Sequence, residues 1–226
     1  MKKYAIILAG GRGTRMNSEV PKQFILLNGK PVLYYAINTF LETYEDCRVI
    51  LVLPEENVAA GQEIIDAFFS YDRIEIVAGG RTRFHSVQKG LDLVDDEDSI
   101  IFVHDAVRPL VSKKLIERCY DSAAAFGSAI PVTDCRDSVR IIITDGNEAA
   151  DRKNIKLVQT PQAFHAKILL PAFFGIDYKD RFTDEAAVVE AFGLKVALIT
   201  GDEENIKLTT PADILIAEAI LNDRSN

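Results

Sequence analysis

Short apolar runs alternate with longer amphipathic runs along most of the chain. Six apolar, β-rich runs predict strands, at Tyr4–Leu8, Arg48–Leu53, Ile74–Val77, Ser99–Val103, Ala129–Val132 and Lys195–Ile199. Several of these runs are apolar at consecutive positions, which is typical of parallel strands covered on both faces. The stretches between them predict helices, the first opened by Pro31 and the others at Val58–Phe69, Arg83–Leu93, Lys113–Phe126, Thr183–Phe192 and Pro211–Leu221.

This alternation predicts an α/β fold, a Rossmann-like doubly wound and mostly parallel sheet sandwiched by helices. We expect one domain over residues 1–226. Residues from about 134 to 162 depart from the alternation, since "SVRIII" is followed by the polar "TDGNEAADRKN" and then "IKLVQ". That pattern predicts a β-hairpin with a long loop, projecting as an arm that contacts a second subunit. The alternative is a surface loop that makes no contact with a second subunit.

The overall charge narrows the possible partners. The chain has 226 residues and a formal net charge of -8, which argues against a general nucleic-acid binder. Any site for a polyanion must therefore be a local basic cluster. No stretch approaches the roughly 20 apolar residues of a membrane span. Cysteines are few, odd in number and without metal or redox spacing, so we expect a cytoplasmic protein with reduced thiols.

A glycine-rich loop, "LAGGRGTRM", follows the first predicted strand. Glycine lets the backbone approach a ligand and direct its N–H groups at oxygens. The dinucleotide-binding fingerprint is broken, because Met16 stands where a third small residue is needed and no acid lies near Lys30. The Walker pattern also fails, since Gly29-Lys30 is followed by Pro31. A dinucleotide-dependent dehydrogenase is therefore disfavoured.

Two cations follow the glycines. Arg15 can grip two oxygens through its planar guanidinium, and Lys22, just after Pro21, supplies a compact point charge. Such a loop suits a nucleoside triphosphate, whose negative charges must be neutralised while one phosphorus is attacked. The alternative is a tight turn with solvated charges, which the combination of glycine, arginine, proline and lysine disfavours.

A second cluster lies in "VHDAVRP", directly after a predicted buried strand. Asp105 and Arg108 therefore lie near the carboxyl end of a strand, where α/β proteins bind ligands. An acid there can face a ribose hydroxyl or a magnesium ion. A structural ion pair is the alternative, and the spacing alone leaves both open.

These motifs carry a family resemblance. "LAGGRGTRM…PKQF" is similar to the signature of sugar- and polyol-phosphate nucleotidyltransferases. Within these, the chain most resembles the 2-C-methyl-D-erythritol 4-phosphate cytidylyltransferases, and further stretches match in order: "GGRTRFHSV", "VHDAVRP", "DSVR", "DR", "QTPQAF", "TDEA" and "NIKLTTPAD". The resemblance implies transfer of CMP from CTP to 2-C-methyl-D-erythritol 4-phosphate, giving 4-CDP-2-C-methyl-D-erythritol and pyrophosphate in non-mevalonate isoprenoid precursor synthesis.

The resemblance also implies roles for particular residues, with Mg²⁺ or another divalent cation as cofactor and a homodimer formed through the arm. The groups expected to act in catalysis are Arg15, Lys22, Arg152 and Lys207. The arginine at 152 would come from the neighbouring subunit and would bind the acceptor phosphate together with Lys207. The residues expected to bind substrate are Ala9, Gly10, Gly11, Gly13, Gly80, Arg81, Ser86, Asp105, Ala106, Arg108, Thr160, Thr183 and Asp184, with Asp105 also beside the metal.

Two alternatives of the same fold remain. The loop begins Leu-Ala-Gly-Gly where the family more often has Ala-Ala-Gly, and this variant also resembles ribitol 5-phosphate cytidylyltransferases. The stretches "FTDEAAVVEAFG" and "RFHSV" favour methylerythritol phosphate as acceptor. A non-catalytic nucleotide-binding protein is the other alternative, which the presence of Arg15, Lys22 and Asp105 disfavours.

Overall fold

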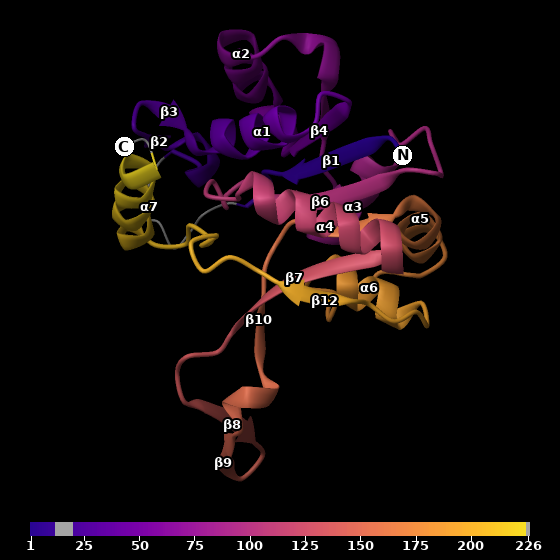
Figure 1. Cartoon of the computed structure of the whole chain (residues 1–226), viewed down its shortest axis with the longest axis vertical. Coiled ribbons are helices and arrows are strands. Elements are labelled where there is room, and N and C mark those ends of the chain that lie inside the picture. Colours follow the sequence, from indigo (N-terminus) through magenta and orange to yellow (C-terminus); the bar gives the residue numbers. More distant parts are fainter. Residues whose placement is uncertain (12–19, 225–226) are drawn as a thin grey trace.

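The computed structural model describes residues 1–11 and 20–224. In that part of the chain one mixed sheet of eight strands forms the centre of the molecule (Figure 1). The strand order is β10-β7-β11-β6-β1-β4-β5, with β12 beside β7. The bounds are β1 Lys3–Leu8, β4 Cys47–Leu53, β5 Ile74–Ala78, β6 Ile100–Asp105, β7 Ser128–Asp134, β10 Lys156–Val158, β11 Gln162–His165 and β12 Leu198–Thr200.

Because β1, β4, β5 and β6 run parallel, their carboxyl ends lie at the same edge of the sheet. β1 runs parallel to β4 and β6, and β4 runs parallel to β5, whereas β11 is antiparallel to its neighbours. In this register Leu8 lies opposite both Val52 and Asp105. The loops that follow β1, β4 and β6 therefore leave the sheet side by side. The predicted α/β fold with a mostly parallel sheet is confirmed.

Helices cover both faces of the sheet because successive strand side chains point in opposite directions. In β1, Ala5 and Ile7 belong to one core cluster, and Tyr4 and Ile6 belong to the other. The first cluster includes side chains of α1 (Val32–Thr43), α2 (Val58–Phe68) and α4 (Lys113–Phe126). The second includes side chains of α3 (Arg83–Leu91), α5 (Ala166–Phe174) and α6 (Glu185–Ala191).

Local signals explain where the helices begin. Ser112 caps α4, because its Oγ accepts a hydrogen bond from the backbone N–H of Leu115 at 3.0 Å. Asp184 caps α6 in the same way, accepting from Ala187 at 2.9 Å. The predicted helix start at Thr183 is thus two residues early, since α6 begins at Glu185.

The last helix, α7 (Pro211–Arg224), packs with a smaller hydrophobic cluster that includes Leu27. Leu27 belongs to β2 (Leu26–Leu27), which pairs with β3 (Lys30–Pro31).

The arm is present and projects away from the sheet (Figure 1). It is the hairpin of β8 (Val139–Ile143) and β9 (Gly146–Ala150). The expected pairing of "SVRIII" with "IKLVQ" is wrong, because β10 pairs with β7 instead. A two-residue turn at Thr144-Asp145 closes the hairpin early, and Gly146 follows at φ 139°. The polar β9 carries no apolar alternation that would reveal a strand.

Short 3-10 helices connect several elements, namely η2 (Lys22–Phe24), η3 (Glu55–Asn57), η4 (Tyr71–Arg73) and η5 (Arg152–Asn154). Within the described ranges, none of the helices has the length and apolar character that crossing a membrane would require. The cytoplasmic location stays a prediction.

Candidate active site

A cavity of about 620 Å³ opens at the carboxyl edge of β1, β4, β5 and β6. Polar and charged groups from distant parts of the chain meet there. Its lining residues are Leu8, Ala9, Gly10, Gly11, Lys22, Gln23, Val52, Leu53, Pro54, Glu55, Glu56, Gly79, Gly80, Arg81, Thr82, Arg83, Ser86, Asp105, Val107 and Lys207. The sequence-predicted loop after β1, the start of α3 and the end of β6 are thus brought together.

Two glycines of the lining differ in how much space surrounds them. A Cβ on Gly11 would lie 3.4 Å from Cε of Lys22, an ordinary van der Waals contact, so the lysine side chain lies against the loop without requiring a glycine there. A Cβ on Gly80 would lie 2.4 Å from Cβ of His85, which excludes any larger residue without a shift of α3. The close turn allows the N–H of Gly80 to donate to Oγ of Ser86 at 3.1 Å.

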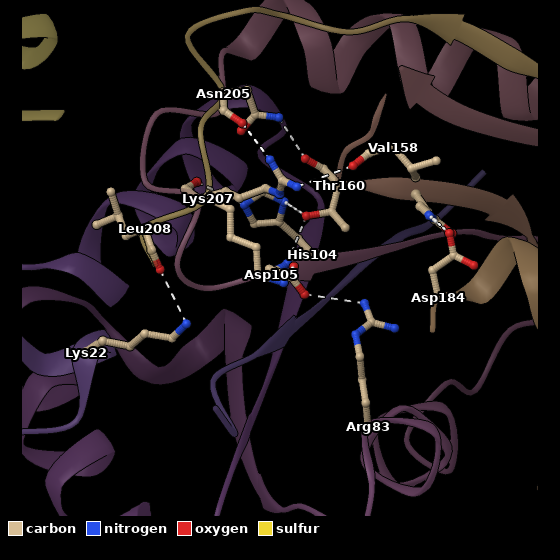
Figure 2. A network of polar contacts seen from close by, with 12 residues as sticks. Lys22, Arg83, His104, Asp105, Val158, Thr160, Asp184, Asn205, Lys207 and Leu208 are labelled. Atoms are coloured by element: carbon tan, nitrogen blue, oxygen red, sulfur yellow. Dashed lines mark hydrogen bonds and ion pairs between the residues drawn. The ribbon is translucent and has the colours of Figure 1, made fainter. Parts of the chain in front are cut away.

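Asp105 stands at the end of β6 between two cations (Figure 2). Lys207 Nζ lies 2.7 Å from its Oδ2, and Arg83 Nη2 lies 3.4 Å from its Oδ1. Burial would raise the pKa of this carboxyl, but the charges of Arg83 and Lys207 outweigh burial and hold the pKa below its ordinary value. Asp105 is therefore a carboxylate at neutral pH.

Arg83 also pairs with Glu185, a contact that the sequence analysis did not predict. The guanidinium contacts both carboxylate oxygens of Glu185, which is fully buried in the first turn of α6. Burial raises the pKa of Glu185, and the charge of Arg83 opposes that rise. A signal was present, since Glu185 lies at helical spacing with the buried Val188 and Val189. An acid within an apolar helix face indicates a buried partner.

Lys22 begins η2 and is only 9% exposed. Its Nζ donates to the carbonyl oxygen of Leu208 at 3.3 Å, so it lies close to the segment that carries Lys207 (Figure 2). The neighbouring Gln23, also missed by the sequence analysis, lines the cavity. Its Nε2 is buried and has no hydrogen-bond partner within residues 1–11 and 20–224.

A buried chain of hydrogen bonds supports Asp105 from behind. The backbone N–H of Asp105 donates to Thr160 Oγ1 at 3.0 Å, and this oxygen lies 3.1 Å from His104 Nδ1. His104 Nε2 lies 3.2 Å from the carbonyl oxygen of Arg108. A neutral imidazole with its proton on Nε2 satisfies all three contacts. His104 thus holds the Thr160 hydroxyl, which in turn positions the Asp105 backbone.

Burial lowers the pKa of His104 to about 4, which predicts a pH dependence of stability. The unfolded chain takes up a proton at this position below about pH 6.5, and the folded protein does not. The free energy of unfolding should therefore fall by about 2 kcal/mol between pH 7 and pH 5 through this group. Urea unfolding of wild type and His104→Gln tests this, with His85→Gln as control. An unchanged pH slope in His104→Gln would contradict the assignment.

The described lining of the cavity does not include every predicted site residue. Gly13 and Arg15 fall outside the described residues. Ala106, Arg108, Arg152, Thr160, Thr183 and Asp184 are not among the residues that line the cavity. Arg108 donates to the carbonyl oxygens of Asn205 and Val158, and Asp184 accepts from Gln162 Nε2 as well as capping α6. Their predicted roles in binding stay predictions.

The cavity suits a divalent cation that is shared with a polyphosphate. No three His, Cys, Asp or Glu residues gather into a metal-binding group in the described ranges. Magnesium, however, is usually bound through one or two carboxylates plus substrate phosphates. Asp105 offers one such carboxylate inside the cavity, so the residues present fit this mode of binding.

A glycine-bounded cavity with cations around one carboxylate, at the carboxyl edge of a mostly parallel sheet, is an arrangement that suits a phosphorylated ligand. The family model described as IspD, 2-C-methyl-D-erythritol 4-phosphate cytidylyltransferase, matches residues 4–223. The chain belongs to this family, and the resemblance found in the sequence is confirmed.

Individual relatives agree over nearly the whole chain. The 2-C-methyl-D-erythritol 4-phosphate cytidylyltransferase of Phocaeicola vulgatus is 44% identical over 221 residues, covering 98% of this chain and 100% of that protein. The protein of the same name from Syntrophus aciditrophicus is 40% identical over 224 residues, covering 97% and 96%. The crystal structure of 4-diphosphocytidyl-2C-methyl-D-erythritol synthase from Anaerococcus prevotii is 29% identical, with a TM-score of 0.83 and coverage of 98% and 96%.

Proposed function

We propose that this chain transfers CMP from CTP to 2-C-methyl-D-erythritol 4-phosphate and releases pyrophosphate, with residues 1–226 acting as one nucleotidyltransferase domain. The observation that carries the proposal is the cavity itself, where Arg83 and Lys207 pair with Asp105 and Lys22 lines the same space. Membership of the family supports the choice of nucleotide and acceptor.

The chemistry is mainly an electrostatic problem. The acceptor phosphate is already an anion, so the enzyme needs no general base. One anion must approach another, and negative charge grows on the leaving pyrophosphate, so preorganised cations lower the barrier. Lys22 is positioned by η2 beside the glycine-rich loop, where it stabilises charge at the α-phosphate and leaving group. Arg15 shares this role in the proposal.

Asp105 is the residue that would hold a divalent cation, Mg²⁺ in the proposal. When bound, the ion neutralises charge on the triphosphate. The chain's own part is to keep the Asp105 carboxylate ionised and oriented, through Arg83 and Lys207 on its oxygens and Thr160 on its backbone. Ala106 and Arg108 would support the nucleotide from the same turn.

Recognition of cytosine is assigned to the start of α3. Free backbone N–H groups face ligands at a helix N-terminus, and Gly80, Arg81 and Ser86 line the cavity there. Ser86 Oγ contacts the backbone N–H and carbonyl of Gly80, which fixes the hydroxyl near the turn. Ala9, Gly10, Gly11 and Gly13 of the first loop would contact the phosphates.

The acceptor phosphate is assigned to Lys207 and to Arg152 of a second copy of the chain. Within one chain Arg152 lies in η5 beside the hairpin, exposed, with Nη1 donating to the Arg136 carbonyl oxygen at 2.6 Å. The hairpin strand β8 exposes Ile141, Ile142 and Ile143, a surface suited to a homodimer contact. Thr160, Thr183 and Asp184 would complete the acceptor side.

Arg152→Ala is expected to raise KM for the acceptor about 10-fold, because a lost phosphate contact removes roughly 1.4 kcal/mol of binding. The KM for CTP should stay unchanged. Steady-state kinetics with each substrate varied in turn tests this, with Arg140→Ala in the same arm as the matched control. Loss of CTP affinity alone would mean that Arg152 serves the nucleotide and that the arm is wrongly assigned.

The proposed function is tested by pyrophosphate release from the purified chain. CTP, ATP, GTP and UTP are each combined with 2-C-methyl-D-erythritol 4-phosphate or ribitol 5-phosphate in the presence of Mg²⁺. We expect efficient turnover only with CTP and 2-C-methyl-D-erythritol 4-phosphate. Higher kcat/KM with ribitol 5-phosphate would assign the other acceptor, and no turnover with any pair would favour a non-catalytic nucleotide-binding protein.

A further inference from the structure

The guanidinium of Arg83 contacts two carboxylates that lie far apart in the sequence, those of Glu185 and Asp105. Its Nη1 contacts Glu185 Oε1, while its Nη2 lies 3.2 Å from Glu185 Oε2 and 3.4 Å from Asp105 Oδ1. The guanidinium is thus held on Glu185 by both nitrogens and reaches only one oxygen of Asp105. The second oxygen, Oδ2, is left to Lys207.

The two cations on Asp105 differ in how firmly they are held. Arg83 is fixed by Glu185, which is fully buried at the start of α6. Lys207 has a side chain that is 42% exposed, and its ammonium can leave for solvent or another anion. Oδ2 of Asp105 is therefore the oxygen that can exchange its partner.

A buried carboxylate is an unexpected choice for packing alone. Taking a charge out of water is costly, and neutral side chains of similar volume often stabilise such sites equally well. Glu185 lies between the neighbouring Asp184 cap and the buried Ala186, on the helix face that meets the core. Its charge is explained better by the cation that it holds than by its volume.

Without Glu185, Arg83 has a better arrangement available on Asp105. A planar guanidinium binds both oxygens of one carboxylate through two parallel hydrogen bonds. That pairing would occupy Oδ2 as well as Oδ1. We propose that Glu185 is a positioning residue. It holds the Arg83 guanidinium away from Oδ2 of Asp105, so that this oxygen stays available to the divalent cation. This inference rests on the proposed metal-binding role of Asp105.

The test is a double-mutant cycle read by Mn²⁺ binding in the presence of CTP, without acceptor, measured by water-proton relaxation. Glu185→Gln should weaken Mn²⁺ binding about 10-fold when Arg83 is present. In the Arg83→Met background the same change should alter binding less than about 2-fold, because Arg83 is no longer there to occupy Asp105. Glu190→Gln, an exposed acid on the same helix, is the matched control and should bind Mn²⁺ as wild type does.

Equal losses in both backgrounds would mean that Glu185 acts directly through its charge, and no loss in either would mean that it does not act on the site. Either result overturns the inference. Asp105→Asn tests the underlying function separately: if it binds Mn²⁺ as wild type does, the metal role of Asp105 is wrong. Should Glu185→Gln fail to fold, Glu185→Asp replaces it, with a loss of about 3-fold expected only when Arg83 is present.

Discussion

Lys22→Ala is expected to lower kcat by about 100-fold or more, the scale for losing one preorganised donor to the transition state. Such a loss corresponds to about 2.7 kcal/mol of the barrier. The effect should fall on kcat more than on KM, because in the proposed mechanism the charge that Lys22 meets grows during the reaction.

The structure gives a reason for so large an effect from one lysine. Lys22 is nearly buried, and its side chain lies directly against Gly11 of the loop. A cation fixed in a partly water-excluded cavity acts more strongly than one in solvent. Lys89→Ala, an exposed lysine near the end of α3, is the control that should leave kcat unchanged. Near-normal turnover in Lys22→Ala would remove Lys22 from the mechanism.

Asp105→Asn is expected to lower kcat/KM by about 1,000-fold, equal to about 4 kcal/mol of transition-state stabilisation. The substitution keeps the shape and a hydrogen-bonding oxygen but removes the charge that would hold a divalent cation. It also leaves Arg83 and Lys207 with one neutral partner in place of a carboxylate. Both losses act on the same reaction, so the effect should exceed that of a single lost hydrogen bond.

Activity measured against Mg²⁺ concentration separates the metal from the fold. Asp105→Asn should need far more Mg²⁺ to reach half of its maximal rate, at a temperature where circular dichroism shows that the variant is folded. Asp46→Asn, an exposed acid just before β4 at the opposite edge of the sheet, is the matched control. A wild-type Mg²⁺ dependence in Asp105→Asn would show that the carboxylate does not serve the metal.

The parallel strands β1, β4 and β6 at the centre of the sheet could be predicted well because they are buried. β1, β4 and β6 are apolar at nearly every position, and short apolar runs of this kind are typical of strands that are buried on both faces. α4 could be predicted to the residue because Ser112 caps its start and Gly127, at φ 85°, ends it. The strand β9 could not be predicted, since its five residues are polar or small and lie largely exposed.

The site was harder to predict where it depends on tertiary contacts. The motifs revealed Lys22, Asp105 and Lys207 one at a time, and only the folded chain shows that all three line one cavity. No local pattern indicates that Arg83 meets Glu185, because 102 residues separate them. His104 is a similar case, since its role depends on a contact with Thr160 from another strand connection.

The central claim is that the acceptor phosphate attacks the α-phosphate of CTP in this cavity. The most direct test follows ¹⁸O placed in the phosphate of 2-C-methyl-D-erythritol 4-phosphate, with ³¹P NMR of both products after a complete turnover. We expect the label to stay with the acceptor phosphorus, including the bridge of the new diphosphate, and pyrophosphate to be unlabelled. Label in pyrophosphate, or a diphosphate bridge without label, would contradict it.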